Sequence, residues 1–141
     1  MGRDELDGLL NLCLDFANKM LTEHGEFYPF GAKVSSDGES GLVQGSTGEE
    51  RPAEQALIAL MLEGFRDEAR RGTIRACALC VNVALTRPDG ERVDAVRVTL
   101  EDANEALNLS LPYKIGFRGR VKYGELERNP AQPQVFRPNP Y

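Results

Sequence analysis

Between Thr73 and Glu101 the chain carries two long apolar runs separated by one short polar interruption. The runs TIRACALCVNVAL and ERVDAVRVTLE are rich in β-branched and apolar residues, which favour strands. In the TRPDG that separates them, Pro88 presets φ for the first central turn position, and Gly90 supplies a position where φ can be positive. The pattern predicts two long strands joined by a tight turn.

Two other stretches repeat their apolar residues every three or four positions, the spacing of an amphipathic helix. The first covers residues 4–23 and ends before Gly25, which suits a left-handed C-cap. The second begins near Pro52, a good first-turn residue, and runs to its expected C-cap at Gly72. Gly64 lies inside it and is expected to permit close packing against the sheet. The expected inward residues are Leu6, Leu9, Leu10, Cys13, Phe16, Ala17, Met20 and Leu21 in the first helix, and Ala53, Ala56, Leu57, Leu60, Met61, Phe65 and Ala69 in the second.

The remaining patterns are shorter. Residues 26–45 predict a second hairpin, with its turn at residues 37–38. Apolar and polar residues alternate over residues 107–111, which predicts a half-buried strand that Pro112 ends or places on a sheet edge. Residues 121–126 can add a last short strand.

The order of elements is therefore helix, two strands, helix, three strands (α-β-β-α-β-β-β). It predicts one α+β domain over residues 1–127, in which a single antiparallel five-stranded sheet carries both helices on one face. Residues 128–141 contain four prolines and are expected to form an extended tail. No apolar run approaches the roughly 20 residues that cross a bilayer, and the first residues lack a signal-peptide pattern, so we expect a cytoplasmic protein.

This order resembles the profilin-like arrangement of the roadblock and longin domains, in which five strands carry helices. The similarity covers residues 4–115 and concerns topology alone, because no functional motif of those families matches here. The phrases HGEFYPFGA, at 24–32, and LPYKIGF followed by YGE, at 111–125, are similar to those of a group of small uncharacterised bacterial proteins. That resemblance implies a bacterial origin.

Charge is distributed unevenly along the chain. Residues 113–141 contain six basic and two acidic residues, a net charge of +4, so the remainder must carry -9 to give the total of -5. An acidic molecule as a whole does not attract nucleic acid or anionic lipid. The basic end is better suited to an acidic partner or to the acidic part of another copy.

Cys77 and Cys80 form a C-x-x-C pattern within the first long strand. Residues three apart on a strand point to opposite faces, so these two thiols are not expected to share a metal ion or a disulfide. Cys13 lies on the apolar stripe of the first helix. We expect three reduced, buried thiols and neither a metal nor a cofactor site.

His24 is the only histidine and is expected to end the first helix, where a cation is favoured. It lies eleven residues from Cys13, roughly 16 Å along a helix, which is too far for a Cys-His dyad. No pair of carboxylates stands out as a general acid and base, so the sequence indicates no catalytic residue.

Three of the ten aromatic residues, Phe27, Tyr28 and Phe30, surround Pro29. On an extended segment Tyr28 points opposite to Phe27, so the three cannot all face one core. At least one is a candidate for partner or ligand contact, because exposed aromatics often anchor interfaces. Gly31, which follows them, suggests a close approach of the backbone to another element or a kink.

The segment from Tyr113 to Tyr123, YKIGFRGRVKY, interleaves basic and aromatic residues. Its binding candidates are Lys114, Arg118, Arg120 and Tyr123. Such a segment can line a groove for single-stranded nucleic acid, but the acidity of the rest of the chain argues against that partner.

The sequence therefore predicts a binding module, either a homodimer or an accessory to another protein, rather than an enzyme. One alternative is a small-molecule site or enzyme with a pocket between the 26–45 hairpin and the basic segment, where His24, Tyr28, Lys114 and Tyr123 would be the polar groups. A further alternative is an acidic protein of the immunity or inhibitor type, which covers a basic partner.

Overall fold

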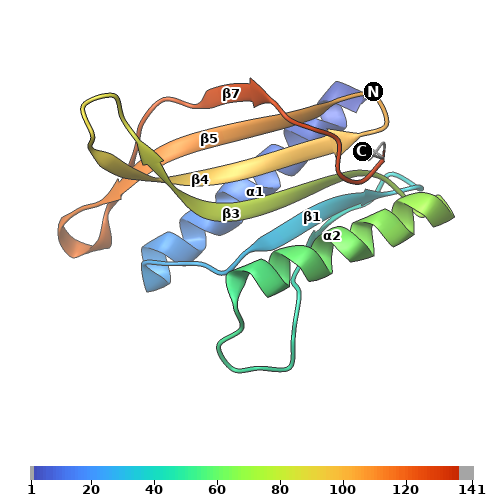
Figure 1. The fold of residues 1–141 in the computed structure, drawn as a ribbon, viewed down its shortest axis with the longest axis horizontal. Helices are drawn as coiled ribbons and strands as arrows, with labels where there is room; N and C mark the ends of the chain where they lie inside the picture. Colours follow the sequence, from blue (N-terminus) through green and yellow to red (C-terminus); the bar gives the residue numbers. More distant parts are fainter. Residues whose placement is uncertain (1, 137–141) are drawn as a thin grey trace.

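Seven strands form one antiparallel sheet in the computed structural model, which describes residues 2–136 (Figure 1). The sheet order is β2-β1-β3-β4-β5-β6, and β7 pairs with β5. The elements are α1 (Gly2–His24), β1 (Phe30–Ser35), β2 (Ser40–Val43), α2 (Glu54–Arg71), β3 (Ile74–Thr86), β4 (Arg92–Asp102), β5 (Ala106–Ile115), the single turn η1 (Phe117–Gly119), β6 (Val121–Tyr123) and β7 (Glu127–Pro130). The α+β class with two helices and an antiparallel sheet is confirmed. The five-stranded sheet and the order α-β-β-α-β-β-β are wrong, because five strands rather than three follow α2.

Turn chemistry accounts for the two predicted hairpins. In the β3–β4 turn, Gly90 has a φ of 88°, and the Asp89 carboxylate accepts a hydrogen bond from the Glu91 N–H at 2.9 Å. In the β1–β2 turn, Gly38 has a φ of 95°, and Asp37 accepts from the N–H two residues on at 3.1 Å. Both turns use an Asp-Gly pair, with the side chain completing the turn and the glycine taking the left-handed conformation.

The strand β5 is longer than predicted because it continues through Pro112. The Pro112 carbonyl accepts a hydrogen bond from the Gly124 N–H at 2.8 Å, on the outer edge of β5. In a strand the N–H and C=O of one residue point to the same side. The N–H that Pro112 lacks would therefore also have faced the outer edge. Along this edge, Pro112 lies between the residues of β5 that pair with β6 and those that pair with β7. The proline therefore removes no hydrogen bond from the ladder with β4.

The two helices lie on opposite faces of the sheet, with α1 behind it in Figure 1. Ala78 and Cys80 of β3 pack in the cluster of α1, whereas Cys77 packs in the cluster of α2 with Phe65. The prediction that both helices share one face is therefore wrong. The strand β3 is apolar at consecutive positions, so it presents apolar side chains on both faces of the sheet. Each face is therefore buried by packing against a helix.

The apolar stripe of α1 is largely buried, as predicted, whereas that of α2 is buried only in part. The buried residues are Leu6, Leu9, Leu10, Cys13, Ala17 and Leu21 in α1, and Leu57, Met61 and Phe65 in α2. Leu60, predicted to point inward, is 43% exposed. Gly64 is also exposed and a Cβ there would meet nothing within 4 Å, so the prediction that it permits close packing is wrong. The helix α2 packs only against β1 and β3, so the side of α2 that faces away from these strands is exposed to solvent.

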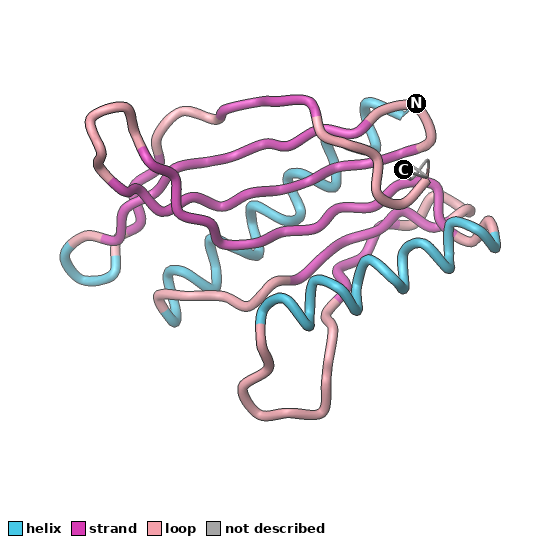
Figure 2. Tube along the Cα trace, in the orientation of Figure 1, coloured by secondary structure: helices cyan, strands magenta, loops and turns pink. Residues whose placement is uncertain are grey.

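The last described residues return across the sheet face that α2 covers in part (Figure 2). Buried Glu101 accepts hydrogen bonds of 2.7–3.2 Å from the backbone N–H groups of Gln134, Val135 and Phe136. Val135 is buried in the cluster of α2. Residues 128–136 of the expected tail thus contact the domain, and residues 137–141 lie outside the described residues. Within residues 2–136, no helix is both long and apolar enough to cross a membrane.

Candidate functional site

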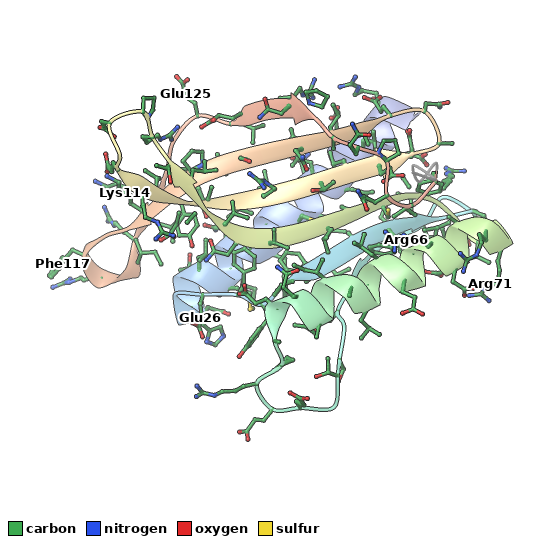
Figure 3. All side chains as sticks on the ribbon, in the orientation of Figure 1. Glu26, Arg66, Arg71, Lys114, Phe117 and Glu125 are labelled. Atoms are coloured by element: carbon green, nitrogen blue, oxygen red, sulfur yellow. The ribbon has the colours of Figure 1, made fainter. Side chains whose placement is uncertain are left out.

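The strands β5 and β6 form a hairpin whose tip extends beyond the end of the sheet (Figure 3). We term residues 114–122 the basic hairpin. At its tip the side chain of Phe117 points away from the rest of the molecule and is 84% exposed, the highest exposure among the large apolar residues that the structure describes. Exposing so large an apolar ring to water is unfavourable, and a partner that covers it would remove that cost.

The backbone at the tip is held in an unusual conformation. Arg118 has a φ of 60° and Gly119 a φ of 74°, and the Arg120 N–H donates to the Phe117 carbonyl at 3.4 Å. Positive φ at both central residues is the pattern of a type I′ turn. It costs an arginine on the order of 1 kcal/mol, and residues held in such conformations concentrate at binding sites. The Arg118 guanidinium lies 5.3 Å from the centre of the Phe117 ring, in range for a cation–π contact.

Positive charge surrounds the exposed ring. Lys114 and Lys122 are directly opposite each other in the β5–β6 ladder, where like charges are destabilising. The Lys114 ammonium lies 3.4 Å from a Glu91 carboxylate oxygen, but no carboxylate in the described part of the chain forms an ion pair with Arg118, Arg120 or Lys122. The basic hairpin therefore presents three cations that no carboxylate among residues 2–136 neutralises.

Two tyrosines fix the root of this hairpin to the domain. Tyr113 and Tyr123 are paired across the ladder. The Tyr113 hydroxyl donates to the side-chain oxygen of Asn82 at 2.9 Å, and burial, with a smaller effect of Asp94, raises the pKa of Tyr113. The Tyr123 hydroxyl bonds to Asn18 of α1, and burial raises the pKa of Tyr123 as well. Both phenols are thus neutral hydrogen-bonding groups at neutral pH, and they anchor the hairpin to the sheet and to α1.

A second feature lies between α1 and the loop that precedes α2. Phe27 and Phe30 are buried, and their rings meet edge to face with centres 5.7 Å apart. Tyr28 is 46% exposed, so the three aromatic side chains do not all lie in one core. Beside them opens a pocket of about 220 Å³, the aromatic cavity, lined by Phe16, Met20, Phe27, Tyr28, Pro29, Phe30, Gln44, Gly45, Pro52 and Leu57.

The predicted site residues fall into two groups. Lys114, Arg118, Arg120 and Tyr123 belong to the basic hairpin or its root, whereas Phe27, Tyr28 and Phe30 line the aromatic cavity. Tyr28 lines this cavity, while Lys114 and Tyr123 line a separate depression next to Arg87, so the structure does not join them in one pocket. His24 is exposed at the end of α1, with its nearest carboxylate, on Glu23, at 4.0 Å.

Phe117 is the residue that sequence reasoning did not select. It lies within the predicted basic segment, but a phenylalanine that alternates with polar residues along a strand indicates a core residue. Gly116 and Gly119 could have indicated its exposure. Two glycines that flank two residues favour a tight turn, and the tip of such a turn is exposed.

Cys77 and Cys80 point to opposite faces of the sheet, as predicted, and all three cysteines are buried and free. Burial raises the pKa of the Cys77 and Cys80 thiols, so both are protonated at neutral pH. Among residues 2–136 no group of three or more His, Cys, Asp or Glu side chains is placed to hold a metal ion.

Comparison with known proteins matched no protein-family model, no curated protein and no solved structure. Function is therefore inferred from the basic hairpin and the aromatic cavity themselves.

Proposed function

We propose that this protein works by binding another protein chain through the basic hairpin. The observation that carries the proposal is Phe117, an aromatic side chain 84% exposed at the tip of an anchored hairpin and surrounded by cations. A few side chains supply most of the binding energy at a protein interface, and aromatic residues and arginine are enriched among them. Because Tyr113 and Tyr123 already hold the root of the hairpin, little conformational entropy is lost on binding.

The chemistry of the hairpin defines the surface that it fits. Its partner presents an apolar recess for Phe117 and acidic side chains for Arg118, Arg120 and Lys122. Single-stranded nucleic acid would also offer stacking and negative charge, but the acidic remainder of this chain opposes such a polyanion. An inhibitor that covers a basic partner would use that acidic remainder, whereas the exposed aromatic anchor lies on the basic hairpin.

Site-specific photo-crosslinking tests this proposal. A photoreactive phenylalanine analogue placed at position 117 is expected to give a discrete protein adduct in cells, and Arg118→Glu with Arg120→Glu is expected to abolish it. The matched control is the same analogue at position 126, where Leu126 is 46% exposed but lies outside the hairpin. Equal labelling from the two positions, or adducts that survive the charge reversal, would show that the hairpin is not the binding surface.

The aromatic cavity favours a second candidate function, the binding of a small apolar ligand. Its volume of about 220 Å³ is below the roughly 300–1,000 Å³ of pockets for drug-sized molecules, so only a small ligand would fit. A ligand bound there should raise the melting temperature of the wild type, and Tyr28→Ala should reduce that rise at unchanged fold. His24→Ala should leave the rise unchanged, since His24 does not line the cavity.

A further inference from the structure

We infer that the partner is a second copy of this chain, with Phe117 of one copy seated in the aromatic cavity of the other. This inference rests on the proposed binding function and names the partner. Both surfaces are present on one chain, and the described residues of that chain cover neither of them. Phe117 projects into solvent, and the cavity has no described side chain filling it.

The sizes of the ring and the cavity match. An apolar void of roughly 150 Å³ is enough to hold a benzene ring. The aromatic cavity measures about 220 Å³, which accommodates one phenylalanine side chain but not a bulky cofactor. Its walls include Phe16, Phe27 and Phe30, and aromatic rings pack favourably edge to face with another ring.

The charges around the two surfaces are complementary. The segments that line the cavity carry Glu26, Glu49, Glu50 and Glu54, all exposed, and none of the four forms an ion pair with a cation in residues 2–136. The same segments carry two basic residues, Lys19 and Arg51, so the four carboxylates outnumber the cations. The basic hairpin, whose Arg118, Arg120 and Lys122 form no ion pair with the described residues, would bring cations towards these carboxylates when Phe117 enters the cavity.

The positions of the two surfaces permit a closed pair. The basic hairpin and the end of α1, where Glu26 follows, lie at the same end of the molecule in Figure 3, and Phe117 points away from Glu26. Phe117 does not line the cavity of its own chain. Two copies related by a two-fold axis can each offer the hairpin to the other, which forms two equivalent contacts and closes the assembly.

Sedimentation analysis over a wide concentration range tests the inference. The wild type is expected to form a dimer that weakens at high salt, because exposed ion pairs are screened. Phe117→Ala is expected to weaken the dimer by about thirtyfold or more, as for an interface anchor. Gln44→Trp, which places a bulky ring at the cavity mouth, is expected to do the same, and Leu126→Ala is expected to have no effect.

Mixing the two weakened variants supplies the decisive measurement. The Phe117→Ala chain keeps its cavity and the Gln44→Trp chain keeps its hairpin, so one contact can form between unlike chains and they should associate with each other more tightly than either does with itself. Circular dichroism and melting curves establish that both variants are folded.

Three results would overturn the inference. A wild type that remains monomeric at high concentration excludes the second copy as partner, while a crosslink from position 117 to a different protein would still support the proposed binding function. A dimer that neither variant weakens has its interface elsewhere. A dimer that Phe117→Ala weakens but Gln44→Trp does not uses the hairpin on another surface.

Discussion

Gly31 shows how one missing side chain sets the distance between a helix and the sheet. A Cβ at this position would lie 2.7 Å from the carbonyl oxygen of Ala78 and 2.9 Å from the ring of Phe65. The absence of that atom lets Phe65 of α2 pack directly on the backbone of β1. The close backbone approach suggested by the sequence is confirmed, and it positions α2 at one wall of the aromatic cavity.

Gly31→Ala is therefore expected to lower the free energy of unfolding by about 1–3 kcal/mol, the usual effect of overpacking a core. Urea denaturation of the two proteins measures this difference. The matched control is Gly64→Ala, which adds a methyl group to an exposed helical position with nothing within 4 Å. It should stabilise the protein by up to about 1 kcal/mol, because alanine is the better helix former. Equal effects of the two substitutions would contradict this account of Gly31.

Orientation along a strand is the part of the site that could be predicted residue by residue. The alternation of faces correctly separated Cys77 from Cys80. Phe117 could not be predicted in the same way. Its exposure depends on where the hairpin ends relative to the sheet, and that position is set by the pairing of β5 with β6.

At the scale of elements, one buried carboxylate holds the last described segment in place. Glu101 of β4 accepts from three successive backbone N–H groups, at residues 134–136. Hydrogen bonds to a charged acceptor are worth more than neutral ones, and buried N–H groups left without a partner are costly. Glu101 is therefore the hydrogen-bond acceptor for this backbone, while Arg66, which donates to the Gln134 carbonyl at 2.7 Å, and the buried Val135 add further contacts.

Glu101→Gln leaves a single side-chain oxygen for these three N–H groups and adds two donors. The substitution is expected to lower the free energy of unfolding by about 1.5–3 kcal/mol and to speed amide hydrogen exchange at residues 134–136 before the rest of the sheet. Glu105→Gln is the control, since Glu105 makes an exposed ion pair with Arg3, and it should change stability by less than about 1 kcal/mol. Unchanged exchange at residues 134–136 in Glu101→Gln would show that the segment is held by other contacts.

The elements that could be predicted are those whose sequence pattern lies within a few neighbouring residues. Both helices and both Asp-Gly hairpins could be predicted, because periodicity, caps and turn residues lie within a few positions of each other. The strand β7, with the sequence ERNP, has no apolar alternation and contains a proline. It is a strand only because the outer edge of β5 is available beside it, and no local pattern carries that information.

At the scale of the whole molecule, buried thiols link stability to pH. Burial is the main cause that raises the pKa of Cys77 and of Cys80 above the ordinary value of 9.0. Above pH 9 the thiols of the unfolded chain lose their protons while those of the folded chain keep them. The unfolded state then binds fewer protons than the folded state, so the free energy of unfolding falls as pH rises.

We expect full stability below pH 9 and a loss above it of about 1.4 kcal/mol per pH unit for each of these thiols, measured by urea denaturation in reducing buffer. Cys77→Ala should have a shallower slope above pH 9 than the wild type, whatever its stability at pH 7. The same slope in both proteins would mean that the Cys77 thiol titrates normally in the fold.

The sequence alone determined the class of the fold, the two helices, the turns and the direction in which strand side chains point. These follow from interactions between residues close together in the chain, where periodicity and backbone preference act. Only the tertiary structure decided that the helices cover opposite faces, that β7 completes the sheet, and that Phe117 stands clear of the domain while an aromatic cavity opens beside α1. These depend on which distant segments meet, because burial and exposure are set by the whole assembly of elements and by no single stretch of the chain.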